Sequence, residues 1–261
     1  MPAPQPDEIY ERTREEGRRR MSRPVLELAA TAIVGGFDVA FGIAALVLTE
    51  AAVAEHSSLG LSRLAGAIAF GIGFVFVVVG KSELFTENFL VPIAALDRSR
   101  WGSWLKLGEL WVVTLVLNLL GGALLAVILT SHGILPAGAA DAVARLADQL
   151  TAYGAWTGFV SAIVAGALMT LMTWFVEGSA DAMGIRIVMA WIVGALIALG
   201  TFNHAIVSTI ELVFGMRYGT GVSFADLFVN LGVSVGGNLV GGLALVTFVR
   251  SFQALAGGSD T

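Results

Sequence analysis

The sequence has no cysteine among its 261 residues, so disulfide bonds, thiolate nucleophiles and cysteine-ligated metals are excluded. Charged residues are scarce as well: they make up 13% of the chain, against about 25% in an average soluble protein. So few charges cannot cover a soluble surface of this size. The net charge of −5 gives no support for nucleic-acid binding.

Apolar residues are abundant instead. They form 56% of the chain, and the mean hydropathy is +0.82. This composition is typical of a polytopic membrane protein. The 32 glycines fit that class, because small residues let transmembrane helices approach closely.

A membrane-spanning helix needs about 20 apolar residues. Six stretches qualify: 25–54, 64–96, 104–131, 155–177, 185–215 and 224–250. We therefore predict an all-α integral membrane protein with six transmembrane helices in one domain, residues 25–250. Residues 1–24 form a basic N-terminal segment, either a tail or an amphipathic surface helix, and residues 251–261 form a C-terminal tail.

The lysines and arginines of the short loops predict the orientation in the membrane. Six spans place both termini on one side. Eleven cations lie on that side: Arg12, Arg14, Arg18, Arg19, Arg20, Arg23, Arg98, Arg100, Lys106, Arg186 and Arg250. Three lie on the other side: Arg63, Arg145 and Arg217. This bias predicts a multi-pass protein of the inner (plasma) membrane with both termini in the cytoplasm.

Two of the six spans carry polar residues in their middle. Span 64–96 would be about 50 Å long as one helix, whereas the hydrocarbon core is about 30 Å thick. It contains the polar segment 80–88, and span 185–215 contains the polar segment 200–204. Irregular backbone at membrane depth is tolerated only where it is buried in protein or lines a cavity. We therefore expect both helices to be interrupted.

The two halves of the chain repeat one pattern. The segment Asn118–Gly122 (NLLGG) recurs 120 residues later as Asn238–Gly242 (NLVGG), and Gly80 and Gly200 at the two breaks have the same offset. Residues 25–131 and 155–250 therefore look like two copies of a three-helix unit. An odd number of spans gives the copies opposite topology. Inverted repeats with matched interruptions are typical of a transport site near the membrane midplane.

Three motifs carry a resemblance to a known family. The segment Gly80–Thr86 (GKSELFT), the segment Phe202–His204 (FNH) and the two NLxGG segments are similar to motifs of the formate/nitrite transporter family, and the resemblance covers residues 25–250. It implies an aquaporin-like protomer, a homopentamer and one pore in each protomer. It also implies transport of a small monovalent anion such as formate, nitrite or hydrosulfide, in some cases with a proton.

The sequence also departs from that family. Members typically have a lysine on the fourth helix, whereas span 155–177 contains no cation here. Four charged residues lie near the first break instead: Lys81, Glu83, Glu87 and Asp38. This pattern indicates a divergent member. One hypothesis is that Lys81 supplies the missing positive charge, and Asp38 or Glu83 is its expected partner. The alternative is an ion-pair cluster that only holds the loop.

His204 is the leading candidate for the pore, since it is the only histidine within a span. A neutral imidazole can donate its N–H to a passing anion, and an imidazolium can supply a proton. Thr86 occupies a comparable place in the other half, although its hydroxyl could bond its own helix instead. The remaining pore candidates are Leu84, Phe85, Phe202 and Asn203. The three apolar ones either pack or form a constriction.

Other polar residues have structural interpretations. The amides of Asn118 and Asn238 can satisfy backbone groups freed at the breaks. Glu211 lies two turns after His204. It either lines a vestibule or sits at the membrane interface, and the interface is the expected place.

Functions other than anion transport have less support in the sequence. The chain lacks an H-E-x-x-H motif and a G-x-S-G serine motif, so we expect no enzyme, no metal and no cofactor. A channel for a neutral or cationic solute and a non-transporting membrane protein remain alternatives.

Overall fold

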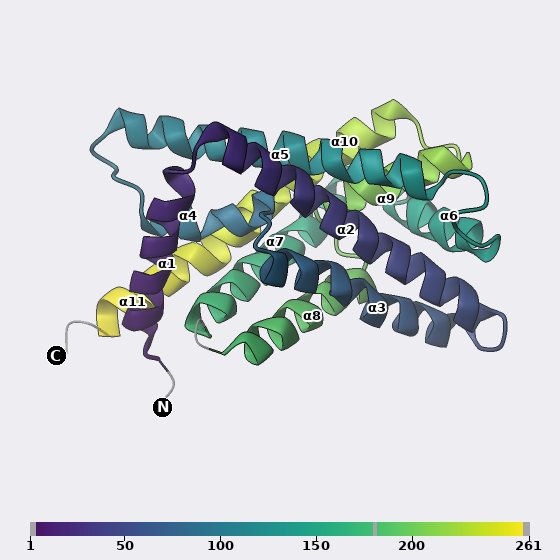
Figure 1. Ribbon diagram of the computed structural model, residues 1–261, viewed down its shortest axis with the longest axis horizontal. Coiled ribbons are helices and arrows are strands. Elements are labelled where there is room, and N and C mark those ends of the chain that lie inside the picture. Colours follow the sequence, from purple (N-terminus) through teal and green to yellow (C-terminus); the bar gives the residue numbers. More distant parts are fainter. Residues whose placement is uncertain (1–3, 180–181, 258–261) are drawn as a thin grey trace.

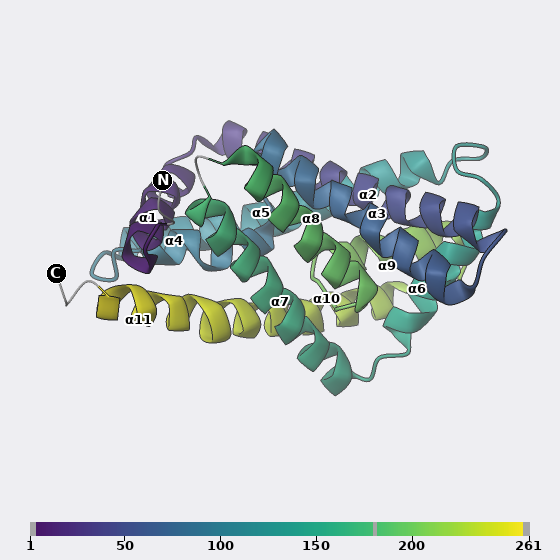
Figure 2. The same cartoon turned by 90° about the horizontal axis from the view of Figure 1, so that it is seen from below.

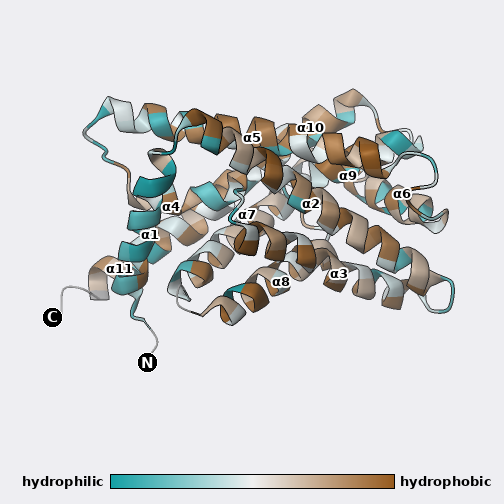
Figure 3. Ribbon diagram, viewed as in Figure 1, coloured by the Kyte–Doolittle hydropathy of each residue, from teal (hydrophilic) through white to brown (hydrophobic). Residues whose placement is uncertain are grey.

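The computed structural model describes residues 4–179 and 182–257, and these form helices and loops without a strand. Five helices are long and apolar enough to cross a membrane: α2 (Val25–Ala54), α3 (Leu59–Gly80), α5 (Trp101–Leu129), α7 (Ala155–Gly178) and the continuous helix from Phe224 to Ala256. A shorter apolar helix, α8 (Met183–Leu199), lies between them in sequence. Figure 3 shows hydrophobic residues along all of these helices.

The second predicted span is interrupted where expected. α3 ends at Gly80, and after a loop the chain forms two short helices, η1 (Phe85–Phe89) and α4 (Val91–Ala94). The fifth predicted span is interrupted in the same way, because α8 ends at Leu199 and α9 (Val207–Tyr218) begins after an irregular segment. At both breaks a residue other than glycine adopts the left-handed conformation: Lys81 with φ 55° and Thr201 with φ 47°.

The last helix is longer than predicted. α10 (Phe224–Leu239) continues through the π-helical stretch η2 (Val240–Thr247) into α11 (Phe248–Gly257). The predicted tail is therefore helical through Gly257, because nothing breaks the helix after position 250. Residues 258–261 of that tail lie outside the described residues.

The two halves run in opposite directions. In Figures 1 and 2, α2 runs away from the end of the molecule that holds both termini, whereas α7 runs towards it. Matching glycines allow close packing in each half. A Cβ atom at Gly36 would overlap the carbonyl oxygen of Asn118, and one at Gly166 would overlap that of Asn238. The helix pairs α2/α5 and α7/α10 can therefore approach until their backbones touch.

Two helices lie outside the predicted spans. α1 (Pro6–Met21) is the charged N-terminal helix and packs against α4, α7 and α11. α6 (Gly138–Thr151) was not predicted, and it lies in the connection between the halves. Its apolar face packs against α2 and α9 and has six buried residues: Ala139, Ala142, Val143, Leu146, Ala147 and Leu150. With 14 residues of mixed polarity, α6 is too short and too polar to match the pattern of a membrane span.

Candidate functional site

Each break is held by one asparagine with the same set of hydrogen bonds. Asn118 Nδ2 donates to the carbonyl oxygens of Ala32 (2.7 Å) and Glu83 (2.8 Å), and Asn118 Oδ1 accepts from the backbone N–H of Phe85 (2.9 Å). Asn118 at the first break and Asn238 at the second are both fully buried. This geometry supports the structural interpretation of the two amides, because each one satisfies backbone groups that the broken helix leaves free.

The second asparagine repeats the pattern. Asn238 Nδ2 donates to Ala162 O (2.8 Å) and Asn203 O (3.1 Å), and Asn238 Oδ1 accepts from Ala205 N (2.9 Å). The residues Asn238, Asn203 and Ala205 each lie 120 positions after a counterpart in the first half. These counterparts are Asn118, Glu83 and Phe85. The two halves therefore share their break geometry as well as their sequence motif.

The two breaks bring Thr86 and His204 into contact. Thr86 Oγ1 lies 2.8 Å from His204 Nε2, and both residues are fully buried. Thr86 therefore bonds across the halves, and its hydroxyl does not bond its own helix. The Phe74 ring of α3 lies 6.2 Å from the His204 ring, centroid to centroid. Phe74 was not among the sequence candidates, because it looks like any other apolar residue of its span.

The other ring nitrogen of His204 determines its protonation. Nδ1 accepts hydrogen bonds from the backbone N–H groups of Ile206 (3.2 Å) and Val207 (3.1 Å). A nitrogen that accepts from two N–H groups carries no proton, so the ring is neutral and its proton lies on Nε2. His204 Nε2–H then donates to Thr86 Oγ1. The Thr86 hydroxyl hydrogen is left free to donate elsewhere.

Two cavities lie at opposite ends of α3 and α8. The α6-side cavity, about 230 Å³, is lined by Leu46, Glu50, Arg63, Ala67, Arg145, Leu146, Asp148, Gln149, Ala198, Leu199 and Thr201. The α1-side cavity, about 220 Å³, is lined by Glu16, Arg19, Arg20, Arg23, Val77, Val78, Lys81, Ser82, Glu87, Val176, Glu177 and Arg186.

The stretch of α3 between the cavities is closed by buried side chains. Ala67 and Val77 belong to different cavities and lie about 15 Å apart along the helix. Phe70 and Phe74 occupy α3 between them, and both are fully buried. Leu84 and Phe85 of the first break are buried in the same apolar cluster. The contact between Thr86 and His204 is thus a buried polar pair in apolar surroundings.

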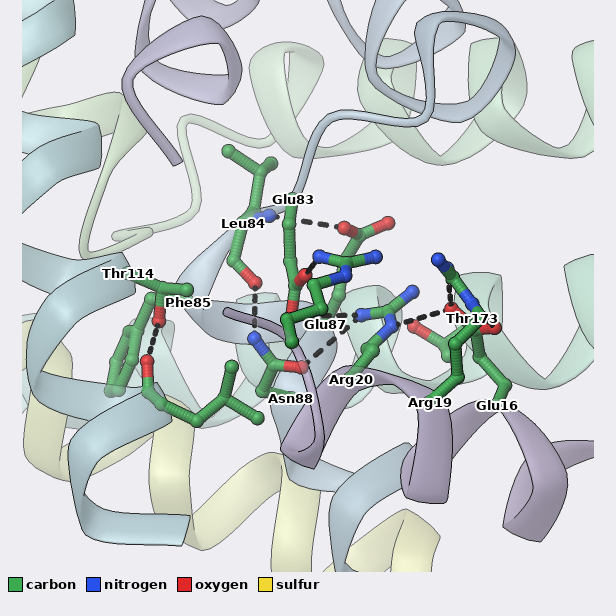
Figure 4. Close-up of polar contacts among 12 residues, drawn as sticks. Glu16, Arg19, Arg20, Glu83, Leu84, Phe85, Glu87, Asn88, Thr114 and Thr173 are labelled. Carbon is green, nitrogen blue, oxygen red and sulfur yellow. Dashed lines mark hydrogen bonds and ion pairs between the residues drawn. The ribbon is translucent and has the colours of Figure 1, made fainter. Parts of the chain in front are cut away.

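The N-terminal segment reaches into the first break. Arg23 forms an ion pair and a hydrogen bond with Glu83, and Arg20 lies 3.6 Å from the same carboxylate. Arg20 also donates to Asn88 Oδ1 at 3.2 Å. Figure 4 shows Arg20 extending from its helix towards these loop residues. Glu83 therefore pairs with two arginines that no sequence signal had linked to the break, since they are about 60 residues away.

Glu16 completes this cluster on α1. Burial opposes its ionisation, but hydrogen bonds from Arg19 and the charge of Arg20 outweigh burial and lower the pKa of Glu16 to about 2. Arg19 donates two short hydrogen bonds to it, of 2.5 and 2.6 Å. Glu16 is thus ionised at neutral pH, and its bonds to Arg20, which also contacts Glu83 and Asn88, tie α1 to the break.

The other charged candidates are placed differently from expectation. Asp38 accepts a hydrogen bond from Ser82 Oγ (2.5 Å) and does not pair with Lys81. Glu87 accepts from the backbone N–H of Leu84 (3.1 Å) and so caps η1. Lys81 is exposed, lines the α1-side cavity and has no ion pair within the described part of the chain. The expected pairing of Lys81 with Asp38 or Glu83 is wrong, because Ser82 and the arginines occupy those carboxylates.

Two pore candidates of the second break lie away from the polar pair. The Phe202 ring packs over Gly200 and lines a separate cavity with Tyr153 and Trp156. The side chain of Asn203 turns towards α7, where its Nδ2 donates to Gly158 O at 3.4 Å. The structure therefore joins Thr86, His204, Leu84 and Phe85, and separates Phe202 and Asn203 from them.

Helices broken at matched positions, with a buried polar pair between two cavities, define a membrane channel or transporter. The family model for the formate/nitrite transporter matches residues 7–252 of the chain. The chain therefore belongs to the formate/nitrite transporter family, as its motifs indicated. The members and neighbours of this family are channels and transporters.

Several known proteins are similar to the chain. It is 26% identical to "Inner membrane protein YfdC" of Escherichia coli over 94% of this chain and 77% of that protein. It is 29% identical to a "Probable formate transporter" of Methanothermobacter thermautotrophicus over 85% of this chain and 87% of that one. The solved structure "Pentameric formate channel with formate bound" has the same fold, with TM-score 0.72 and 20% identity over 88% of this chain and 97% of that one.

Proposed function

We propose that the protein is a channel or transporter for a small monovalent anion of the formate, nitrite or hydrosulfide class, and that its role is transport without catalysis. The observation that carries the proposal is the Thr86–His204 contact between two cavities. Each protomer contains its own pore, and the likeness to a pentameric formate channel supports a homopentamer. Lys81 on the rim of the α1-side cavity adds positive charge that attracts the anion.

The geometry supports a specific role for the polar pair. His204 Nε2–H holds Thr86 Oγ1, and the free hydroxyl hydrogen of Thr86 donates to a passing anion. Phe74, Leu84 and Phe85 exclude water around this donor. A bare anion crosses such a constriction at far greater cost than its neutral conjugate acid. Protonation of the anion before the constriction therefore favours passage.

The proposal includes an orientation. Both termini lie at the end of the molecule that holds the α1-side cavity (Figures 1 and 2), and eleven loop cations lie on that side against three on the other. We place this end in the cytoplasm and the α6-side cavity outside the inner membrane. Residues 25–250 form the transport domain, and residues 1–24 form a cytoplasmic segment.

Uptake by purified protein in liposomes tests the function. Formate, nitrite and hydrosulfide should enter faster than into protein-free liposomes, and uptake should rise as the external pH falls. Lactate and ammonium serve as comparison solutes. Preference for ammonium would replace the anion assignment with a cation channel, and the absence of flux for every solute would leave a structural membrane protein.

A further inference from the structure

The α1-side cavity contains two cations without an ion-pair partner. Among the described residues, five cations line it: Arg19, Arg20, Arg23, Lys81 and Arg186. The first three are paired with the carboxylates Glu16, Glu27 and Glu83. Lys81 and Arg186 form no ion pair with any residue that the structure describes. The cavity, of about 220 Å³, therefore presents an ammonium group and a guanidinium group to a ligand.

Arg186 is the less satisfied of the two. Its Nε is shielded from solvent and has no hydrogen-bond partner. Leaving a charged donor without an acceptor is unfavourable. A guanidinium group matches the oxygens of phosphate and carboxylate groups, which it can bind with two parallel hydrogen bonds. An anion in the cavity therefore supplies acceptors that the described part of the chain does not give to Arg186.

Three carboxylates also face the cavity, and they do not take up the two free cations. Glu16 accepts hydrogen bonds from the arginines of α1, and Glu87 accepts the backbone N–H of Leu84. Glu177 of α7 lines the cavity and forms no ion pair within the described ranges. Its charge opposes a bound anion, so such a site depends on both Lys81 and Arg186.

The cavity lies at the ends of three apolar helices. Val77 and Val78 belong to the last turn of α3, Val176 and Glu177 to the last turn of α7, and Arg186 to the first turn of α8. This end of the molecule holds both termini (Figures 1 and 2) and is the one that we place in the cytoplasm. Basic pockets between transmembrane helices on that side are typical sites for the phosphate groups of lipids.

An apolar face of α8 begins beside the cavity. Ile185, Val188 and Ile192 are exposed, and their spacing of three and four residues places them on one side of the helix. Ile185 directly precedes Arg186. A lipid with its headgroup in the cavity can therefore lay its acyl chains along α8.

We propose that the α1-side cavity binds a phosphate group, with Lys81 and Arg186 as its ligands. The group belongs to inorganic phosphate or to the headgroup of an anionic phospholipid, since both offer the same oxygens. It bridges the first break, which carries Lys81, and α8, which carries Arg186. A ligand that binds only the folded protein stabilises it, so this binding can be measured without transport.

Thermal unfolding of the delipidated full-length protein in mild detergent tests the site. Sodium phosphate should raise the melting temperature above that in sodium chloride of equal ionic strength and pH. Arg186→Gln and Lys81→Gln should each raise the phosphate concentration needed for half of this shift at least about tenfold, as expected for loss of a charge-assisted hydrogen bond. Glu177→Gln should lower that concentration, because it removes a repulsive charge.

Arg98→Gln is the matched control. It removes one cation from an exposed loop on the same side, outside the cavity lining, and should leave the phosphate dependence unchanged. An undiminished shift in both Arg186→Gln and Lys81→Gln overturns the site. Formate at the same concentration should give a smaller shift. A formate shift as large as that of phosphate and equally reduced in Arg186→Gln would make the cavity a site for the transported anion and overturn the phosphate assignment.

Added lipid distinguishes the two sources of the phosphate group. Phosphatidylglycerol is compared with phosphatidylcholine of the same chain length in the same detergent. Stabilisation by phosphatidylglycerol that is reduced in Arg186→Gln identifies a lipid headgroup, whereas stabilisation by inorganic phosphate alone identifies the free ion. Stabilisation by neither overturns the proposal. These results do not depend on transport, so failure of formate uptake would refute the proposed function and leave the phosphate site to be decided by the melting temperatures.

Discussion

Two backbone amides on Nδ1 limit what the His204 side chain can do. An imidazolium would carry a proton on that nitrogen, so charging His204 requires the hydrogen bonds from Ile206 and Val207 to break. In the folded state the ring therefore acts as a neutral donor that orients Thr86. The sequence alone allows both a neutral and a charged ring, and the geometry favours the neutral one.

Substitution of His204 should change transport and leave assembly intact. His204→Ala removes the donor to Thr86 and should alter the rate or the selectivity among formate, nitrite and hydrosulfide. His204→Phe should narrow and dry the constriction and abolish flux. Uptake in liposomes is the measurement, and Phe202→Ala, whose ring faces a separate cavity, is the control. Wild-type flux in both His204 variants would show that the ring only packs.

Lys81 and Arg23 should respond differently to the same substitution. Lys81 is exposed at the cavity rim, so Lys81→Met should lower anion uptake while the protein melts near the wild-type temperature. Arg23 pairs with the buried Glu83, whose other partner is Arg20 at 3.6 Å, so Arg23→Met removes the nearer of two cations and should cost up to about 3–5 kcal/mol of stability. Uptake and thermal unfolding in detergent measure the two effects. A destabilised Lys81→Met with normal uptake per folded molecule would make that charge structural.

At the scale of the elements, each broken helix depends on one asparagine. Asn118→Ala removes the hydrogen-bond partner of the Glu83 carbonyl and of the Phe85 N–H in the buried break, and a bond that ties the break to Ala32 of α2. We expect a loss of roughly 3 kcal/mol or more, and a similar loss for Asn238→Ala. Thermal unfolding is the measurement. Asn230→Ala in α10 is the matched control, since the Nδ2 of Asn230 has no hydrogen-bond partner, and an equal loss in that variant would contradict the argument.

The attachment of α1 should depend on pH through Glu16. Its pKa is lowered to about 2 in the folded protein, so its ion pairs stabilise the fold above the ordinary pKa of a glutamate, about 4.3, and this stability is lost as the pH falls towards about 2. Glu16→Gln should therefore melt below the wild type at neutral pH. The difference should shrink as the pH falls through this range. A constant difference across the acid range would show that the charge of Glu16 does not hold α1.

For the whole molecule, the proposed orientation and assembly can be measured directly. A reporter fused after Thr261 should behave as cytoplasmic, because both termini lie on the side with the loop cations. Mass measurement in mild detergent should give five copies of the 27.2 kDa chain. A periplasmic reporter would reverse the assignment of the two cavities, and a stable monomer or dimer would contradict the pentamer.

Much of the fold could be predicted from local patterns. The hydropathy of residues 25–54 and 155–177 marks α2 and α7 to within a few residues, and polar segments mark both breaks. The equal spacing of the two NLxGG segments revealed the repeat. The helix α6 was not predicted, because its 14 residues of mixed polarity are too few for a membrane span and carry no hydropathy signal.

The sequence by itself determined the class of protein and the place of the breaks, and it singled out His204 and Thr86 as candidates, because each follows from composition or from spacing along the chain. Only the tertiary structure decided which charges meet. Glu83 pairs with Arg23 rather than Lys81, and the Glu211 side chain is buried where α9 packs against α2, α5, α6 and α10. Such pairings depend on how α1 and α6 fold back against the bundle. Long-range packing of this kind leaves no periodic trace in the sequence.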